Sequence, residues 1–303
     1  MCPQNLATTR RDFIRKVGLG AGSVLATSRN TFAAGIISRA RKEGAAAGAS
    51  RAVSGPDTNV AAPFTLGLAS YSFRAFSLDE AVAMTRRLGL DAIALKSVHL
   101  ALDSPPDAVQ AAAAKVRAVG LDLYGCGVVY MKSGDEIRQA FEYARAAGLS
   151  LIIGVPDIEL LPLAEKAVRE YDIRLALHNH GPTDKVYPTP ESAYLKIRDL
   201  DPRIGLCLDA GHAARSGLDP ANEAEKYFDR LLDVHVKDVT SADVEGGPVE
   251  IGRGVVDIPN LLRALVRFGF GGKVSLEYEK DEKDPLPGAA ESVGYLRGVL
   301  DTL

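Results

Sequence analysis

Residues 174–209 read RLALHNHGPTDKVYPTPESAYLKIRDLDPRIGLCLD, and this stretch contains the repeating unit of the fold. A short apolar run at 174–178 is followed by 191–200, where apolar residues recur at helical spacing, and then by a second apolar run at 204–209. Short apolar runs are typical of buried strands, and the amphipathic segment is typical of a helix that packs on them. The stretch therefore predicts a strand, a helix and a second strand parallel to the first.

The same alternation continues along most of the chain. Apolar runs that predict strands lie at 66–70, 91–96, 121–126, 149–155, 174–178, 204–209, 232–236 and 273–277. Segments with helical periodicity lie at 78–88, 107–119, 135–147, 158–171, 191–200, 220–228, 258–268 and 289–300. Eight strand–helix units over about 240 residues fit a closed (β/α)8 barrel, the TIM barrel. A doubly wound open sheet is the alternative fold, and it is less favoured because no Gly-x-Gly-x-x-Gly turn follows the first strand.

Several helix starts carry capping signals. Ser77 has Glu80 three residues later, which is the pattern of a capping box. The pairs Thr189-Pro190 and Asp219-Pro220 each place a cap residue before a proline that the first turn of a helix accepts. These signals support the predicted helix positions.

The N-terminal part of the chain has a different composition. Residues 9–16 read TRRDFIRK and precede an apolar run at 17–26, which is too short to cross a bilayer, and then small residues at 31–34. We interpret residues 1–34 as an export signal that resembles the twin-arginine type, with a disordered basic tail as the alternative. The signal predicts a periplasmic or otherwise extracytoplasmic protein and makes the twin-arginine (Tat) translocase a partner during export.

Residues 35–62 are rich in Gly, Ala and Ser, and we interpret them as a flexible linker before a barrel domain at 63–303. No stretch of eighteen apolar residues follows, so we expect no stable membrane insertion. Residues 1–61 carry nine Lys/Arg against three Asp/Glu, whereas the rest carries 27 against 36. An acidic domain repels a phosphate backbone, which argues against nucleic acid as a partner.

The three cysteines form neither a disulfide pattern nor a metal-binding motif. Cys2 belongs to the predicted signal, while Cys126 and Cys207 lie in separate predicted strands. This spacing gives neither a disulfide pattern nor a CxxC metal motif. We expect Cys126 and Cys207 to be buried free thiols, with a pairing of the two across the barrel as the alternative.

Strand register predicts which side chains meet inside the barrel, since residues alternate between the helices and the interior. The apolar pairs that face the helices are Leu175 and Leu177, Leu206 and Leu208, Val234 and Val236, and Val274 and Leu276. The same alternation turns four polar residues inward at the C-terminal ends of four consecutive strands, where active sites of this fold lie: His178, Asp209, His235 and Glu277.

Two imidazoles and two carboxylates that converge in this way predict one divalent metal ion. Nitrogen ligands favour Mn, Co or Zn over Ca, and Mg is also compatible with the carboxylates. Each residue taken singly has a simpler role, such as a core histidine bonded to backbone or an aspartate that caps the next helix. Four of them in one register favour the metal site.

Five segments in order carry a resemblance to a known family: LALHNHG at 175–181, GLCLDAGH at 205–212, DVHVKD at 233–238, GRGVVDI at 252–258 and SLEYE at 275–279. Residues 64–303 resemble the xylose isomerase-like barrel superfamily. That group contains sugar isomerases, ketose 3-epimerases, inosose and dehydroshikimate dehydratases, and endonuclease IV. The chain is most similar to an exported branch described as sugar phosphate isomerase/epimerase.

The resemblance supports Asp209, His235 and Glu277 as metal ligands, because the matching positions bind metal in the family. Strand 5 departs from the family pattern. Many epimerases have there a glutamate that is both ligand and base, whereas this chain has His178. Proton exchange by two glutamates is therefore in doubt. Inosose dehydratase-like members carry a His-rich sequence at this point, and this similarity favours an elimination reaction.

Other residues are candidates for proton transfer and substrate binding. Glu277 is a candidate base as well as a ligand. The further catalytic candidates His180, His212 and Lys237 either share the inward register or follow Asp209 as in the family's Asp-x-x-His motif. Lys237 has an alternative role as an ion-pair partner of Asp238 or Glu279. The candidates for substrate binding follow strands 1, 2 and 7 and are Tyr71, Lys96, His99 and Arg253.

The sequence thus predicts a metal-dependent sugar isomerase or epimerase that acts on a keto-sugar or polyol derivative through an enediolate. One alternative is a dehydratase or eliminating lyase on an inosose or a 3-keto-glycoside, and another is an exported sugar-binding barrel without catalysis. Endonuclease activity is the least favoured, because further His and Asp/Glu ligands for a trinuclear zinc cluster are missing. A small carbohydrate is the expected partner, and a homo-oligomer is compatible with the sequence.

Overall fold

A computed structural model describes residues 62–303. The predicted export signal at 1–34, and the linker as far as residue 61, lie outside the described residues. Within the described part, none of the helices is long and apolar enough to traverse a bilayer.

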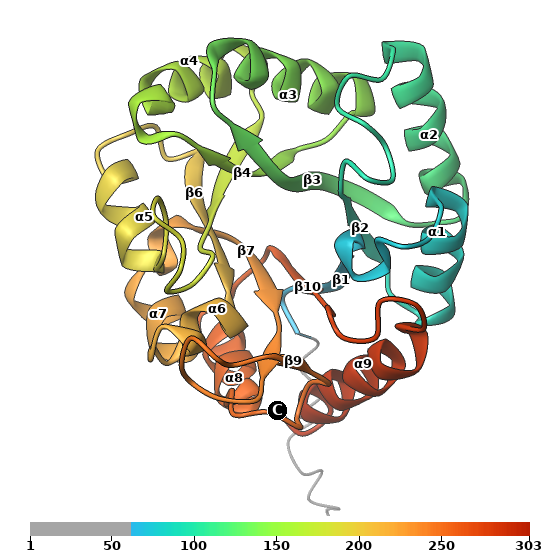
Figure 1. The fold of residues 1–303 in the computed structure, drawn as a ribbon, viewed down its shortest axis with the longest axis vertical. Helices are drawn as coiled ribbons and strands as arrows, with labels where there is room; N and C mark the ends of the chain where they lie inside the picture. The colour runs from blue at the N-terminus through green and yellow to red at the C-terminus, as the bar shows by residue number, and fades with distance from the viewer. Residues whose placement is uncertain (1–61) are drawn as a thin grey trace, which may run out of the picture. The chain divides into compact units, whose positions relative to one another are not determined.

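Eight parallel strands close into a barrel, as the sequence predicts, and the helices form a ring around it (Figure 1). Each strand pairs with the strands before and after it in the chain, and the last pairs with the first. The barrel strands are β1 (Thr65–Ala69), β2 (Ala92–Leu95), β3 (Asp122–Met131), β4 (Leu151–Pro156), β5 (Arg174–His178), β6 (Ile204–Asp209), β7 (Leu231–Val236) and β10 (Lys273–Leu276). Two short strands, β8 (Asp238–Val239) and β9 (Pro248–Val249), form a separate antiparallel pair after β7.

The α-helices are α1 (Leu78–Arg87), α2 (Pro106–Ala118), α3 (Gly134–Ala147), α4 (Leu161–Tyr171), α5 (Pro190–Ile197), α6 (Ala210–Arg215), α7 (Pro220–Lys226), α8 (Ile258–Phe268) and α9 (Leu286–Leu300). Short 3-10 turns occur at η2 (Ser70–Phe73), η3 (Ile158–Leu160) and η4 (Phe228–Arg230). The predicted caps are present: Ser77 and Glu80 form a capping box, Thr189 caps α5, and Asp219 caps α7.

Strand β3 continues five residues beyond the predicted end at 126. The apolar pattern is interrupted by Gly125 and Gly127, which hid the continuation. At Gly127 the backbone lies so close to β4 that an added Cβ would collide with the carbonyl oxygen and side chain of Ile153. Register shifts there, between Cys126 and Val129. The extension matters because it carries Tyr130 to the end of the barrel that holds the site.

Helix α6 was not predicted as a separate element. It begins directly after β6, where the side chain of Asp209 accepts a hydrogen bond from the backbone nitrogen of His212 at 2.7 Å. A side-chain acceptor at this position satisfies one of the free N–H groups of the first turn. The short helix therefore turns the chain away from the barrel and leaves Asp209 fixed at its rim.

The segment between β7 and α8 is held by the side chain of Asp238. Its two carboxylate oxygens accept hydrogen bonds from the backbone nitrogens of Gly252, Gly254 and Val256, at 2.9 to 3.1 Å. An added Cβ at Gly254 would collide with the same carboxylate. This loop is thus anchored on a buried side chain at the end of β7.

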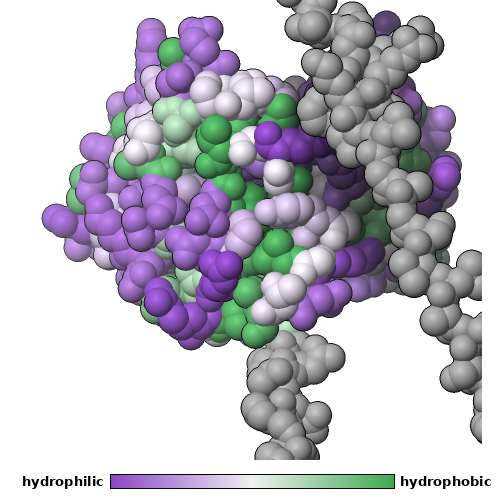
Figure 2. All heavy atoms as spheres, turned by 90° about the horizontal axis from the view of Figure 1, so that it is seen from below, coloured by the Kyte–Doolittle hydropathy of each residue, from purple (hydrophilic) through white to green (hydrophobic). Residues whose placement is uncertain are grey.

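Apolar side chains fill the space between strands and helices, in keeping with the predicted register: Leu175, Leu177, Leu206 and Leu208 are all at most 2% exposed. On the surface, the large apolar residues are scattered over many elements. On the face in Figure 2, hydrophilic residues cover much of the visible surface and smaller apolar areas lie between them.

Candidate metal centre

The four predicted ligands meet at one end of the barrel. His178, Asp209, His235 and Glu277 each offer one ligand atom, and these atoms all lie within 4.8 Å of one another. The four side chains are buried, with exposed fractions of 0 to 6%. They come from β5, β6, β7 and the residue after β10, four neighbouring strands of the closed barrel.

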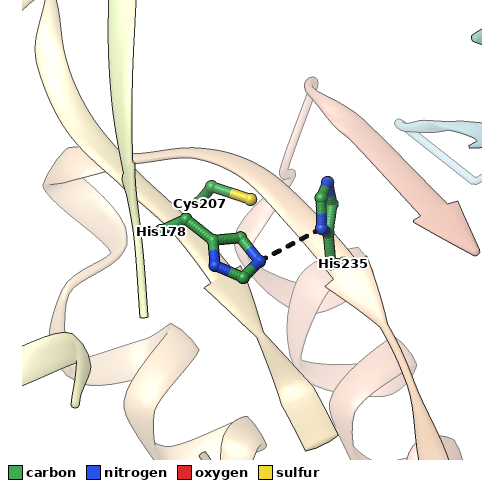
Figure 3. Close-up of side chains that lie close together, drawn as sticks. All are labelled: His178, Cys207 and His235. Carbon is green, nitrogen blue, oxygen red and sulfur yellow. Dashed lines mark hydrogen bonds between the residues drawn. The ribbon is translucent and has the colours of Figure 1, made fainter. Parts of the chain in front are cut away.

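The donor atoms lie close to one another. His178 Nε2 and His235 Nδ1 are joined by the hydrogen bond drawn as a dashed line in Figure 3. The two nitrogens are 3.2 Å apart, and His178 Nε2 is 3.6 Å from Asp209 Oδ2. His235 Nδ1 lies 3.4 Å from Glu277 Oε2. Asp209 Oδ2 is buried and makes no hydrogen bond, although buried polar atoms are nearly always satisfied. A donor set of two imidazole nitrogens and two carboxylate oxygens around one point suits a divalent metal ion.

Asp209 can cap a helix and bind a metal at once. Its Oδ1 accepts from the backbone of His212, and its main-chain nitrogen is held by Asn179 Oδ1 at 2.9 Å. Oδ2 stays directed at the other ligands. The two roles weighed against each other from sequence therefore use different oxygens of one carboxylate: Oδ1 caps the helix, and Oδ2 is available to a metal ion.

The ammonium group of Lys237 lies between three carboxylates. Its ammonium is 2.9 Å from Glu277 Oε2, 3.2 Å from Glu279 Oε2 and 3.4 Å from Asp209 Oδ2. Burial disfavours the charged form of Lys237, but the three carboxylates outweigh burial and raise its pKa. Burial also acts against the charge of Glu277, yet Lys237 and His235 hold the pKa of that carboxyl well below its ordinary value. Of the two partners in the alternative ion-pair role of Lys237, Asp238 or Glu279, the structure brings Glu279 to the ammonium, together with Asp209 and Glu277.

His180 and His212 flank His178, with ring centroids 4.5 and 6.0 Å from its own. Burial lowers the pKa of His180 to about 4 and that of His212 to about 3. Both rings are therefore neutral near pH 7. His180 Nε2 lies 3.1 Å from Tyr130 Oη, and His212 Nε2 lies 3.5 Å from Lys237 Nζ.

A cavity of about 260 Å³ opens above these residues. Its lining consists of Tyr71, Lys96, Val128, Tyr130, His178, His180, His212, Glu277 and Glu279. The ammonium of Lys96 donates to the carbonyl oxygen of Val128 and lies 5.7 Å from the ring centroids of both Tyr71 and Tyr130. The predicted substrate-binding residues Tyr71 and Lys96 thus lie beside the ligands.

The structure does not bring His99 and Arg253 to this cavity. Both ring nitrogens of His99 are engaged, one with Ser70 Oγ at 2.9 Å and the other with the carbonyl oxygen of Phe73 at 3.1 Å. Arg253 forms an exposed ion pair with Glu291 of α9. Sequence register could not reveal these contacts, because each joins a loop to a distant element.

Three residues near the centre were not predicted as site residues, although Glu279 was named as an alternative partner of Lys237. Glu279 lies two residues after Glu277 and therefore has the same inward register. The sequence already contained this signal. The thiol of Cys207 shares the register of Asp209 and lies beside His178 and His235 (Figure 3). Tyr130 had no such signal, because it follows the irregular part of β3. Cys126 and Cys207 are buried free thiols, as expected.

A second polar layer lies one step deeper in the barrel. Asp233 on β7 is fully buried, and burial raises its pKa to about 7. Tyr124 donates to its carboxylate at 3.3 Å and lies 2.8 Å from Ser275 Oγ. Cys207 Sγ lies 3.6 Å from Asp233 Oδ2. These residues connect four strands beneath the ligands.

The chain belongs to the xylose isomerase-like TIM barrel family, which residues 63–299 match. It is 30% identical over 152 residues to the rhizopine catabolism protein MocC of Rhizobium meliloti, an alignment that covers 45% of this chain and 46% of that protein. It is 27% identical over 150 residues to the inosose dehydratase of Lacticaseibacillus casei, covering 44% of this chain and 50% of the relative. The alignments thus span about half the length of these curated relatives.

Solved structures share the fold at low identity. A zinc-bound IOLI protein superimposes with a TM-score of 0.66 at 16% identity and covers 79% of this chain and 99% of its own. An L-ribulose 3-epimerase superimposes with a TM-score of 0.65 at 17% identity, and the match covers 79% of this chain and 95% of that protein. A probable 3-DHS dehydratase from Bacillus anthracis superimposes with a TM-score of 0.63 at 16% identity, and the match covers 77% of this chain and 99% of that protein. Solved structures that share this fold thus include proteins named as an epimerase and as a probable dehydratase.

Proposed function

We propose that this protein is a metal-dependent enzyme that removes the proton beside the carbonyl group of a keto-sugar or keto-polyol. The observation that carries the proposal is that four donors able to hold a metal ion meet at a cavity, which two of them line together with the imidazoles of His180 and His212. The cavity is small and lined by polar groups, which suits a small polar substrate.

The four donors His178, Asp209, His235 and Glu277 would hold the ion. A bound divalent ion polarises the carbonyl group of a hydroxyketone and stabilises the negative charge that develops when the neighbouring carbon loses its proton. Imidazole ligands favour Mn, Co or Zn, and Mg is compatible. Lys96 binds a substrate hydroxyl or carboxylate from the opposite wall, and Tyr71 and Tyr130 flank that position.

His180 is the base in this proposal. Its ring is neutral and borders the cavity, and the hydroxyl of Tyr130 orients it through the contact at Nε2. His212 is the second candidate for proton transfer, to the oxygen that leaves or is restored. The ammonium of Lys237 lies 3.5 Å from its ring, and because its pKa is raised it keeps its proton and stabilises negative charge there.

Of the two outcomes that follow proton removal, we favour loss of a hydroxyl group, a dehydration. His178 stands where related epimerases are expected to have a catalytic glutamate, and the curated relatives include inosose dehydratases. Isomerisation or epimerisation, the class expected from sequence, is the second candidate. Glu279 favours it, because it places an additional carboxylate in the cavity, 3.2 Å from Lys237.

The proposal is tested by proton exchange in deuterated water, with Zn- or Mn-loaded protein and panels of ketoses, inososes and keto-glycosides. We expect deuterium at the carbon beside the carbonyl and a product lighter by one water. Asp209→Asn and Glu277→Gln should lose both metal and exchange, whereas the exposed control Glu170→Gln should keep both. Full metal content and full exchange in either site variant would refute the proposal. Metal binding without exchange on any substrate would indicate a sugar-binding protein instead.

The two outcomes are separated by His178→Glu. A dehydratase should become slower, because an anionic ligand lowers the net charge of the metal centre and weakens its hold on the developing negative charge. An epimerase should tolerate the change or improve. Faster exchange with a C-epimer as the only product would exclude dehydration.

A further inference from the structure

Asp233 lies directly beneath the metal ligands and has no lysine or arginine within ion-pair distance among the described residues. It is 0% exposed. The group of opposite charge closest to it in the structure is His235, whose Nε2 is 3.6 Å from Asp233 Oδ2. A carboxylate in the interior is costly unless hydrogen bonds and a positive partner compensate it. We therefore ask what the contact between Asp233 and His235 does.

The two nitrogens of His235 face different layers. Nδ1 faces His178 Nε2 and Glu277 Oε2, whereas Nε2 faces Asp233 and is buried without a hydrogen bond. A neutral imidazole carries a proton on one nitrogen and a lone pair on the other. If Nδ1 binds the ion, the proton must remain on Nε2, which faces the Asp233 carboxylate at 3.6 Å.

We infer that Asp233 is a positioning residue that fixes the Nε2-protonated form of His235 and so strengthens metal binding through Nδ1. The inference rests on the proposed metal-dependent function. In known metal sites, a carboxylate that accepts the second N–H of a histidine ligand fixes the ring and raises its basicity. Tyr124 and Cys207 hold the Asp233 carboxylate in place from two other strands, at 3.3 and 3.6 Å.

The experiment is a competition titration of the metal-free full chain with Zn²⁺. Asp233→Ala should weaken Zn²⁺ binding by about 10- to 100-fold, and Asp233→Asn should weaken it less, because the amide oxygen still accepts a hydrogen bond. Glu223→Gln is the matched control, since Glu223 is also a buried acid but belongs to α7. It should bind within twofold of the unchanged chain. Binding within twofold in both Asp233 variants would overturn the inference while leaving the metal site intact.

A second measurement does not depend on the variants' folding. In the unchanged, Zn²⁺-loaded chain with ¹⁵N-labelled histidine, long-range nitrogen–proton correlation spectra report which nitrogen of His235 carries the proton. We expect the proton on Nε2. A proton on Nδ1 would overturn the inference, and failure of the unchanged chain to bind Zn²⁺ would overturn the proposed function with it.

Discussion

Replacement of Lys237 by methionine should destabilise the metal-free protein far more than the metal-loaded one. Methionine keeps much of the length of the side chain but removes the only ammonium that contacts Asp209, Glu277 and Glu279 in the described structure. The three carboxylates then face one another without an ammonium in direct contact, beside the imidazoles of His178 and His235. A divalent ion would restore the missing positive charge.

The magnitude follows from the distances. At an effective dielectric constant of about 20, Coulomb's law gives about 5 kcal/mol for a contact of roughly 3 Å. Part of this energy is offset by the cost of burying the ammonium and by proton uptake on the carboxylates. Removal of one partner from a buried ionic cluster typically costs about 3–5 kcal/mol, and we expect that loss in the metal-free form.

Urea denaturation of the chelator-treated and Zn²⁺-loaded proteins measures the effect as a shift of the midpoint at constant slope. The matched control is Lys115→Met. Lys115 pairs with Asp79 on the surface, where both side chains are more than half exposed, so its removal should cost about 0–1 kcal/mol. The metal-loaded Lys237 variant should recover most of the lost stability.

The reasoning would be refuted by a metal-free Lys237→Met variant as stable as the Lys115→Met control. Equal losses in the metal-free and metal-loaded forms would also contradict it, because they would show that the ammonium and the ion do not serve the same carboxylates. A changed denaturation slope would instead report an altered unfolded or folded state.

Two further predictions concern the cavity wall and the loop after β7. Lys96→Met should raise the KM for a keto-sugar about tenfold with unchanged Zn²⁺ content, because it removes a charged donor from the cavity; an unchanged KM in steady-state assays would contradict it. Glu250→Gln should cost about 1 kcal/mol at pH 7, since hydrogen bonds from Lys280, against the opposing effect of burial, lower the pKa of Glu250 to about 2. The folded-state pKa lies below the ordinary 4.5, so this stability is complete above pH 4.5 and is lost as the pH falls toward 2. The urea midpoints of the unchanged protein and of Glu250→Gln should therefore converge as the pH falls. A constant difference from pH 7 to pH 2 would disprove the stabilising role of the Glu250 charge.

The sequence alone determined the barrel and the four polar residues that meet at its end. Strands and helices of the barrel alternate in the chain, and their periodicities of 2 and 3.6 are local properties that the sequence displays directly. Inward register at the ends of strands then follows from the same period of 2, which is why His178, Asp209, His235 and Glu277 were found without coordinates.

Only the tertiary structure decided what surrounds these ligands. Tyr130 reaches His180 because β3 continues past two glycines, and His99 and Arg253 are drawn to Ser70 and Glu291 instead of the cavity. The physical reason is that closure of the barrel and the course of its loops set such contacts. Each joins side chains far apart in sequence, and no local pattern encodes their distance.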